Sequence, residues 1–213
     1  MSHGTYVPIV MECIVQRACK GRPREFDLDE ALAAALRVFW TKGYDGASLT
    51  DLTDAMGITR PSLYAAFGNK EALFRKALDL YEREKLAYVG EALKAPTSRE
   101  VAERLLRGAL QMQTSDCEPR GCMRVISSVA CGPEADSIRA DLMERRQSSQ
   151  RALCERMQRA KDEGDLPAST DVEGLCAYLG AILQGMSVQA GSGATKAQLE
   201  ALVETSLLMW PGK

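Results

Sequence analysis

One stretch decides the fold of this chain: Ser48-Leu-Thr-Asp-Leu-Thr-Asp-Ala-Met-Gly-Ile-Thr-Arg-Pro-Ser-Leu-Tyr-Ala-Ala-Phe-Gly-Asn-Lys70. It predicts two short helices joined by a tight turn, with a third helix directly after them. Ser48 can cap the first helix, and Gly57 can end it in a left-handed conformation that a side chain would make costly. Thr59 can cap the second helix, with Pro61 in its first turn, where the missing N–H costs nothing.

The second of these helices has two distinct faces. Leu63 and Phe67 lie four residues apart and point to the core, whereas Arg60, Ser62 and Tyr64 face outward. This arrangement is typical of a helix-turn-helix, whose second helix enters the major groove of DNA. A plain helical hairpin with a solvated polar face is the alternative.

The surrounding sequence supports the helix-turn-helix. An amphipathic helix is expected over Asp27–Lys42, ended by Gly43, and another begins near Lys70. The whole run, roughly residues 22–80, resembles the TetR family of transcriptional regulators, and beyond it the resemblance is only architectural. The matching residues are Phe39-Trp-Thr-Lys-Gly-Tyr44, Ser48-Leu-Thr-Asp-Leu52, Ala55-Met-Gly-Ile58, Ser62-Leu-Tyr64 and Phe67-Gly-Asn-Lys-Glu-Ala-Leu-Phe74.

The remaining sequence predicts an all-α protein, because no segment shows sustained strand alternation. We expect about nine helices in total, and three parts: a flexible basic arm (1–24), the helix-turn-helix domain (25–70) and a helical effector-binding and dimerisation domain (71–213). The helices expected in the last part run from Lys70 to near Leu93 and over Ser98–Gln113, Cys122–Cys131, Glu134–Glu163, Asp171–Gln189 and Lys196–Trp210.

The composition is that of an ordinary globular protein. The 213 residues are 46 % hydrophobic and 26 % charged, with a net charge of −2. Glu12 interrupts the only early apolar stretch, Val7–Val15, which also lacks the features of a signal peptide. We therefore expect a cytoplasmic protein with no membrane partner.

The N-terminal arm is basic although the chain as a whole is slightly acidic. Lys20-Gly-Arg-Pro-Arg24 precedes the first helix, and it resembles the Gly-Arg-Pro core of arms that enter the minor groove. Arg22 and Arg24 are therefore candidate DNA contacts, since arginines favour the narrow groove of A·T-rich DNA. A disordered basic tail without sequence preference is equally compatible with the pattern.

The cysteines and the single histidine argue against metal and catalytic sites. The seven cysteines contain no Cys-x-x-Cys pair, and the only histidine is His3. A zinc site needs clustered ligands at short spacings, and neither a phosphate loop nor a nucleophile elbow is present. We expect no metal, no cofactor and no enzymatic activity.

The resemblance implies a set of DNA contacts near the helix-turn-helix. Arg60 can donate two hydrogen bonds to guanine, and Thr50 could reach a base edge or a phosphate. Tyr64 and Lys70 suit phosphate oxygens, which fix register without reading sequence. The complete set of predicted DNA-binding positions in this region is Ser48, Thr50, Arg60, Pro61, Ser62, Tyr64 and Lys70.

The last two helices are candidates for a homodimer interface. Gly180 and Gly185 lie inside a helix, where glycine costs about 0.5–1 kcal/mol relative to alanine, so close approach of another helix is a plausible compensation. The resemblance implies that these two helices pair with their copies in a four-helix interface, and the alternative is that both are simply core. The predicted interface residues are Gly180, Gly185, Leu199, Leu202 and Leu207.

The resulting function is a ligand-responsive, dimeric regulator that binds double-stranded operator DNA. We expect a repressor released from a palindromic operator by an unknown small molecule bound among the middle helices. The predicted pocket residues are Met112, Cys122, Met123, Ser127, Cys131, Met143 and Gln147.

Two alternatives stay open at this point. In the first, the same fold senses oxidants or electrophiles through Cys117, Cys122 or Cys131, with Arg120 near enough to favour the thiolate. The quieter interpretation of these thiols is inert packing. In the second, the chain is a helical interaction module or an enzyme that does not bind DNA.

Overall fold

The computed structural model describes residues 26–130 and 135–212, which form ten α-helices and no strand. The all-α prediction is therefore confirmed for these residues. None of the described helices is both long and apolar enough to cross a lipid bilayer. The helices are α1 (Leu28–Gly46), α2 (Leu49–Met56), α3 (Arg60–Phe67), α4 (Lys70–Lys85), α5 (Ala87–Ala92), α6 (Ser98–Gln113), α7 (Met123–Ala130), α8 (Asp136–Asp162), α9 (Val172–Gly191) and α10 (Lys196–Leu208).

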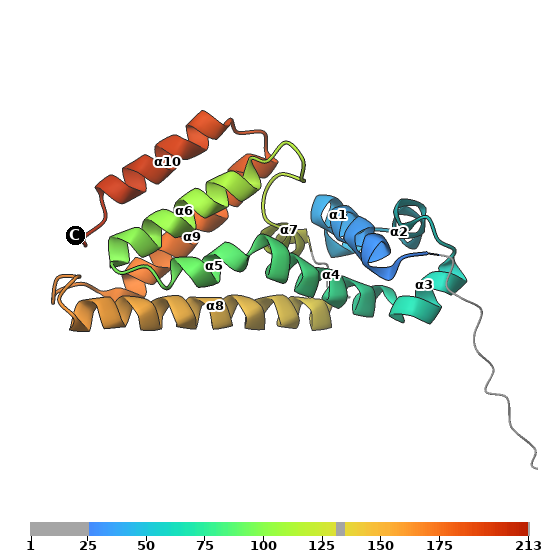
Figure 1. Cartoon of the computed structure of the whole chain (residues 1–213), viewed down its shortest axis with the longest axis horizontal. Helices are drawn as coiled ribbons and strands as arrows, with labels where there is room; N and C mark the ends of the chain where they lie inside the picture. The colour runs from blue at the N-terminus through green and yellow to red at the C-terminus, as the bar shows by residue number, and fades with distance from the viewer. Residues whose placement is uncertain (1–25, 131–134, 213) are drawn as a thin grey trace, which may run out of the picture.

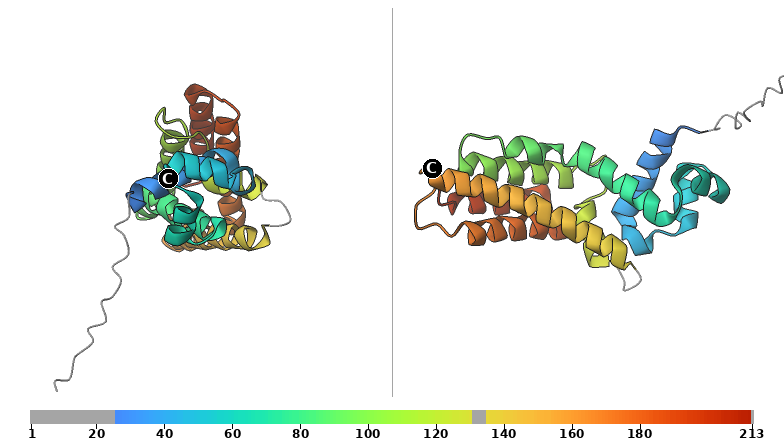
Figure 2. Two further views of the ribbon diagram at one scale, coloured as in Figure 1. Left: turned by 90° about the vertical axis from the view of Figure 1, so that its right-hand side faces the viewer. Right: turned by 90° about the horizontal axis from the view of Figure 1, so that it is seen from below.

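The molecule is elongated, with the helix-turn-helix at one end. Helices α1, α2 and α3 form a head, and the C-terminus lies at the opposite end (Figure 1). Helix α4 runs beneath α1, and the first part of α8 lies beside it before α8 continues beneath the body (Figures 1 and 2). Helices α6, α9 and α10 lie in the part of the molecule away from the head (Figure 1). Helix α4 therefore connects the head to the rest of the chain.

The local signals in the deciding stretch are confirmed. Ser48 caps α2 in a reciprocal capping box with Asp51, and Gly57 ends that helix at φ 65°, a left-handed conformation in which glycine is favoured. Thr59 caps α3 by accepting the backbone N–H of Ser62, with Pro61 in the first turn. These short-range hydrogen bonds fix both ends of the turn.

Two helix boundaries differ from the prediction, and the first of them explains why the described residues form ten helices instead of about nine. The helix expected from Lys70 to Leu93 divides into α4 and α5 at Leu86, whose backbone is not helical (φ −106°, ψ 8°). Leu86 packs on the core beside the head, whereas Tyr88 and Val89 pack on the core of the far end. The break thus lies where the chain crosses from one core to the other. In α1, Gly43 leaves the helical conformation as expected, but the helix resumes and extends to Gly46.

The first of these two cores is not confined to the head. It contains the buried side chains of α1–α3, such as Trp40 and Leu63, together with Phe74 and Tyr81 of α4. Met123 of α7 and Ile138 of α8 complete it. A boundary after residue 70, as the sequence predicted, would therefore cut through a continuous core.

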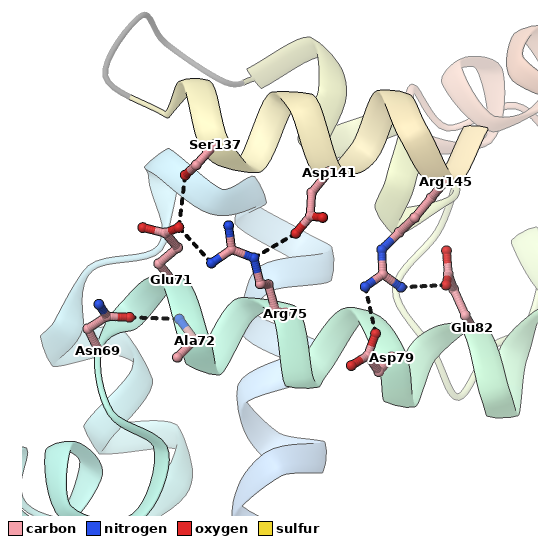
Figure 3. A network of polar contacts seen from close by, with 9 residues as sticks. All are labelled: Asn69, Glu71, Ala72, Arg75, Asp79, Glu82, Ser137, Asp141 and Arg145. Atoms are coloured by element: carbon pink, nitrogen blue, oxygen red, sulfur yellow. Dashed lines mark hydrogen bonds and ion pairs between the residues drawn. The ribbon is translucent and has the colours of Figure 1, made fainter. Parts of the chain in front are cut away.

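A row of ion pairs and hydrogen bonds joins α4 to α8 (Figure 3). Arg145 of α8 binds Asp79 and Glu82 of α4, both at 2.7 Å, and Arg75 binds Asp141 at 2.6 Å. Arg145 is the best shielded of these cations, since 26 % of its side chain is exposed. Because α4 leads into the head, this row fixes the head's connecting helix against α8.

We expect Arg145→Leu to lower the free energy of unfolding by roughly 1–2 kcal/mol, because it leaves Asp79 and Glu82 without their shared partner. Chemical denaturation followed by circular dichroism measures this change. Arg151→Leu, at an exposed position of the same helix, is the matched control, and it should change stability by less than about 0.5 kcal/mol. Equal effects of the two substitutions would contradict a role for the row.

Candidate nucleic-acid interface and effector cavity

The recognition helix α3 presents a polar, exposed surface. Leu63 and Phe67 are buried in the core, whereas Arg60 and Pro61 are exposed and Tyr64 is 49 % exposed. Ser62 is half-buried, and its hydroxyl lies 2.9 Å from that of the cap residue Thr59. The positions predicted to face outward therefore do so, although the Ser62 hydroxyl is engaged with the cap.

Arg60 is held in place by Thr50. The guanidinium of Arg60 donates to the Thr50 hydroxyl at 2.9 Å, which joins the first turns of α2 and α3. This contact orients the side chain best suited to guanine before any DNA arrives. The sequence predicted Arg60 and Thr50 as separate DNA contacts. It did not predict their hydrogen bond, because the two residues lie ten positions apart in the chain.

The hydroxyl of Ser48 serves the helix cap. It accepts the backbone N–H of Asp51 at 3.0 Å and donates to the Asp51 carboxylate at 2.8 Å. Lys42, which sequence reasoning missed, binds the same carboxylate at 2.6 Å. The hydrogen bond from Lys42, followed by that from Ser48, lowers the pKa of Asp51 to about 2. Ser48 is thus a structural residue of the α2 N-terminus as well as a predicted contact.

Lys70 opens α4 next to an aromatic ring. Its ammonium lies 4.5 Å from the centre of the Tyr44 ring, a cation–π geometry. Burial lowers the pKa of Lys70, and the nearby Asp45 opposes that shift. Lys70 is also the first residue of α4, and the backbone N–H groups and dipole at a helix N-terminus favour a phosphate as well. The arm residues Arg22 and Arg24 lie outside the described residues.

A cavity of about 200 Å³ lies among α5, α6, α7, α8 and α9. Of the predicted pocket residues, Met112 and Cys122 line it. Met143 and Gln147 instead line a neighbouring hollow between α8 and α9, and Met143 is 54 % exposed. Cys131 lies outside the described residues.

Two further pocket predictions fall on the wrong face of α7. Met123 is fully buried in the core shared with the head, and Ser127, one turn later, is fully buried as well. The cavity is lined by Arg124, Val125 and Ser128. The sequence predicted a short helix over Cys122–Cys131, but it could not tell which side of this helix would meet the head and which side the cavity.

The described cysteines just before α7, Cys117 and Cys122, differ in exposure and in hydrogen bonding. Cys122 is half-buried; its Sγ accepts a hydrogen bond from the Tyr81 hydroxyl at 3.3 Å, and its N–H donates to the Ser187 hydroxyl at 2.7 Å. Cys117 is exposed in the loop before α7. Arg120 donates to the carbonyl of Ala194, at 3.4 Å, so its guanidinium is engaged with the α9–α10 connection.

The predicted interface residues divide into two groups. Leu199 and Leu207 are buried in the chain's own core, so they have no surface left for a partner. The prediction that these two residues belong to the interface is corrected accordingly. Gly180 borders both hollows, facing Gln150 of α8. Gly185 and Leu202 keep some exposure, and a Cβ at Gly185 would meet nothing within 4 Å. The large apolar side chains exposed on these two helices are Tyr178 at 37 % and Val188 at 55 % on α9, and Leu208 at 84 % on α10. Met209, the C-cap of α10, is 69 % exposed.

The comparisons with known proteins agree over both parts of the chain. The family described as "Bacterial regulatory proteins, tetR family" matches residues 31–77, and "Tetracyclin repressor-like, C-terminal domain" matches residues 102–205. The HTH-type transcriptional repressor ComR of Escherichia coli (strain K12) is 34 % identical, over 94 % of this chain and 95 % of that relative. The chain belongs to the TetR family. Accordingly, it is a DNA-binding transcriptional regulator and not an enzyme.

Two more regulators are similar to this chain along most of their length. The uncharacterized HTH-type transcriptional regulator YezE of Bacillus subtilis (strain 168) is 31 % identical over 88 % of this chain and 97 % of that protein. A cysteine mutant of the TetR family regulator CifR, solved with double-strand operator DNA, is 46 % identical with a TM-score of 0.85. That alignment covers 89 % of this chain and 100 % of the CifR chain.

We expect Arg60→Ala to relax base specificity at one or two symmetric operator positions by roughly 1–3 kcal/mol per contact, because a guanine donor pair is lost. Thr50→Val should reduce base specificity at the same operator positions by a smaller amount, since it only removes the hydrogen bond that orients the Arg60 guanidinium. Affinities for a set of single-base operator variants measure both effects.

Lys70→Ala is the control for this TetR-family head. It should weaken binding to all DNA sequences about equally, because a phosphate contact is lost. The slope of log affinity against log salt concentration should fall by about one for the same reason. If Thr50→Val instead relaxed positions unrelated to those of Arg60→Ala, the proposed pairing of the two side chains on DNA would be wrong.

Proposed function

We propose that this TetR-family protein is a dimeric repressor that leaves a palindromic operator when a small molecule binds in the cavity. The observation that carries this proposal is the double role of α7: Arg124, Val125 and Ser128 line the cavity, while Met123 belongs to the core of the head. A ligand that moves α7 therefore acts directly on the core that positions the recognition helix.

The proposed direction of regulation is supported by a relative. ComR, similar over nearly the whole length of both chains, is named a transcriptional repressor, and this supports repression here. A regulator of chromosomal genes acts where the chromosome lies, so we place the protein in the cytoplasm.

The test is selection of bound fragments from random DNA with the purified full chain, repeated with candidate effectors. We expect enrichment of one palindromic site, and loss of that site with at least one effector. Failure to enrich any sequence under all conditions would favour the rival in which the helical protein is an interaction module.

The dimer is proposed to form through the exposed apolar strip of α9 and α10. Gly185, Val188, Leu202 and Leu208 expose apolar surface there. A two-fold pair of heads is also what a palindromic site requires, because each recognition helix reads one half-site. The arm residues Arg22 and Arg24 are retained in this proposal as minor-groove contacts.

We expect Gly185→Leu to give a folded monomer that fails to bind the operator. Within the chain a side chain at this position meets open space, so its effect should come from a partner, where overpacking typically costs about 1–3 kcal/mol. Sedimentation velocity measures the mass. Gly90→Leu is the matched control, since Gly90 is also a helical glycine with open space and lies on α5. A fully dimeric Gly185→Leu protein would place the interface elsewhere.

A second candidate signal is modification of Cys122 by an electrophile or oxidant. It is favoured by one observation, namely that Cys122 lines the cavity with its sulfur next to the Tyr81 hydroxyl. We expect a Cys117→Ser, Cys122→Ser, Cys131→Ser triple variant to release operator DNA with the same inducer as the unaltered protein, because reversible binding needs no thiol. Electrophoretic mobility shifts with and without inducer decide this, and loss of release in the variant would favour cysteine chemistry.

A further inference from the structure

Two arginine side chains give the wall of the cavity a positive charge. Arg124 and Arg146 are both lining residues, and the lining contains no aspartate or glutamate among the described residues. Arg145, the residue before Arg146, is instead directed to Asp79 and Glu82 on α4. The cavity therefore favours an anionic group.

Arg124 is the cation that a ligand would meet in the interior. Its side chain is only 18 % exposed, and its partners lie at the long limit of contact: the Ser149 hydroxyl at 3.3 Å and Glu82 at 3.5 Å. Glu82 is shared with Arg145, which binds it at 2.7 Å. The guanidinium of Arg124 is thus largely desolvated and only weakly compensated, a costly state that a ligand carboxylate would relieve.

Gln113 adds an unsatisfied polar group. It is the last residue of α6, it lines the cavity, and it is 2 % exposed. Its side-chain Oε1 is buried without a hydrogen-bond partner in residues 26–130 and 135–212. Such groups are rare in native proteins because an unmade hydrogen bond costs free energy. The amide therefore suits a ligand that donates a hydrogen bond.

Tyr88 forms a rigid wall beside these groups. A Cβ at Gly108 of α6 would lie 2.3 Å from its ring, so only glycine lets the ring lie this close to the helix. Burial raises the pKa of the Tyr88 hydroxyl, with the nearby Cys122 adding to the shift and Arg124 opposing it. The hydroxyl therefore stays neutral, and as a lining residue Tyr88 can donate a hydrogen bond to a ligand in the cavity. Most of the remaining lining residues are apolar, among them Leu93, Leu105, Val125, Leu153 and Leu183.

We propose that the effector is an amphipathic carboxylic acid that also carries a hydroxyl group. Its carboxylate binds the Arg124 guanidinium, its hydroxyl donates to the Gln113 amide, and its hydrocarbon body fills the apolar wall. A carboxylate matches the planar, forked guanidinium better than other small polar groups do. This inference rests on the proposed function, because it names the ligand class of the same cavity.

The experiment measures direct binding to the full-length protein without DNA, by isothermal titration calorimetry. The probes are octanoate, its uncharged analogue octanamide, and 2-hydroxyoctanoate. We expect octanoate to bind about tenfold or more tightly than octanamide, because only the carboxylate pairs with Arg124. The hydroxy acid should bind several-fold more tightly still. Equal binding of octanoate and octanamide, or no binding of any probe, would overturn the inference.

Two variants assign the effect to its residues. Arg124→Gln should remove the preference for octanoate over octanamide, whereas the matched control Arg151→Gln, on the exposed surface of α8, should keep it. Gln113→Leu should remove only the advantage of the hydroxy acid. The comparison of probes on the unaltered protein remains decisive even if a variant fails to fold.

Operator binding in the same preparations distinguishes failure of the ligand class from failure of the proposed function. Specific operator binding without carboxylate selectivity would refute the ligand class and leave the proposed function standing. Carboxylate binding by a protein that selects no operator would refute the proposed function and keep the ligand class.

Discussion

The structure depends on one constraint: the core of the DNA-binding head is completed by the body. The indole N–H of Trp40, fully buried in α1, donates to the Gly121 carbonyl at 3.0 Å, just before α7. Arg37, one turn earlier, donates to the Cys117 carbonyl in the same loop at 2.7 Å. Since a buried donor without its acceptor costs about 1–3 kcal/mol, α1 and the α7 segment are held in one arrangement. The head therefore cannot move freely relative to this loop.

This constraint gives the cavity among α5–α9 and the recognition helix a common element. The two faces of α7 are only one residue apart along the chain, with Met123 in the head's core and Arg124 at the cavity. A packed core has few alternative arrangements, so a small rotation of α7 has to be absorbed by neighbouring helices. The ion pairs of Arg145 and Arg75 hold α4 to α8 alongside (Figure 3). Movement of α7 would thus act on the head through α1 while α4 stays anchored.

The parts that the sequence could predict are those decided by neighbouring residues. The caps at Ser48 and Thr59 need only the next three residues, so both were predictable. The Arg60–Thr50 contact depends on how α2 and α3 cross, and the side of α7 that meets the cavity depends on the placement of α1. Likewise, Leu199 reads as surplus apolar surface in the sequence, although the chain's own core buries it. Apolar residues on several sides of a helix indicate that the helix is buried. They do not indicate whether its own chain or a partner chain covers it.

The glycines illustrate the same limit in physical terms. A glycine inside a helix costs about 0.5–1 kcal/mol, so each one indicates a compensation without giving its location. At Gly108 the compensation lies within the chain, because the Tyr88 ring occupies the place of a side chain and forms the cavity wall. At Gly185 a side chain would meet open space, and within the described chain no contact repays the cost. Gly90 on α5 meets open space in the same way, so open space alone does not identify an interface. What distinguishes Gly185 is the exposed apolar side chain of Val188 on the same helix, and this supports the proposed contact with a second copy.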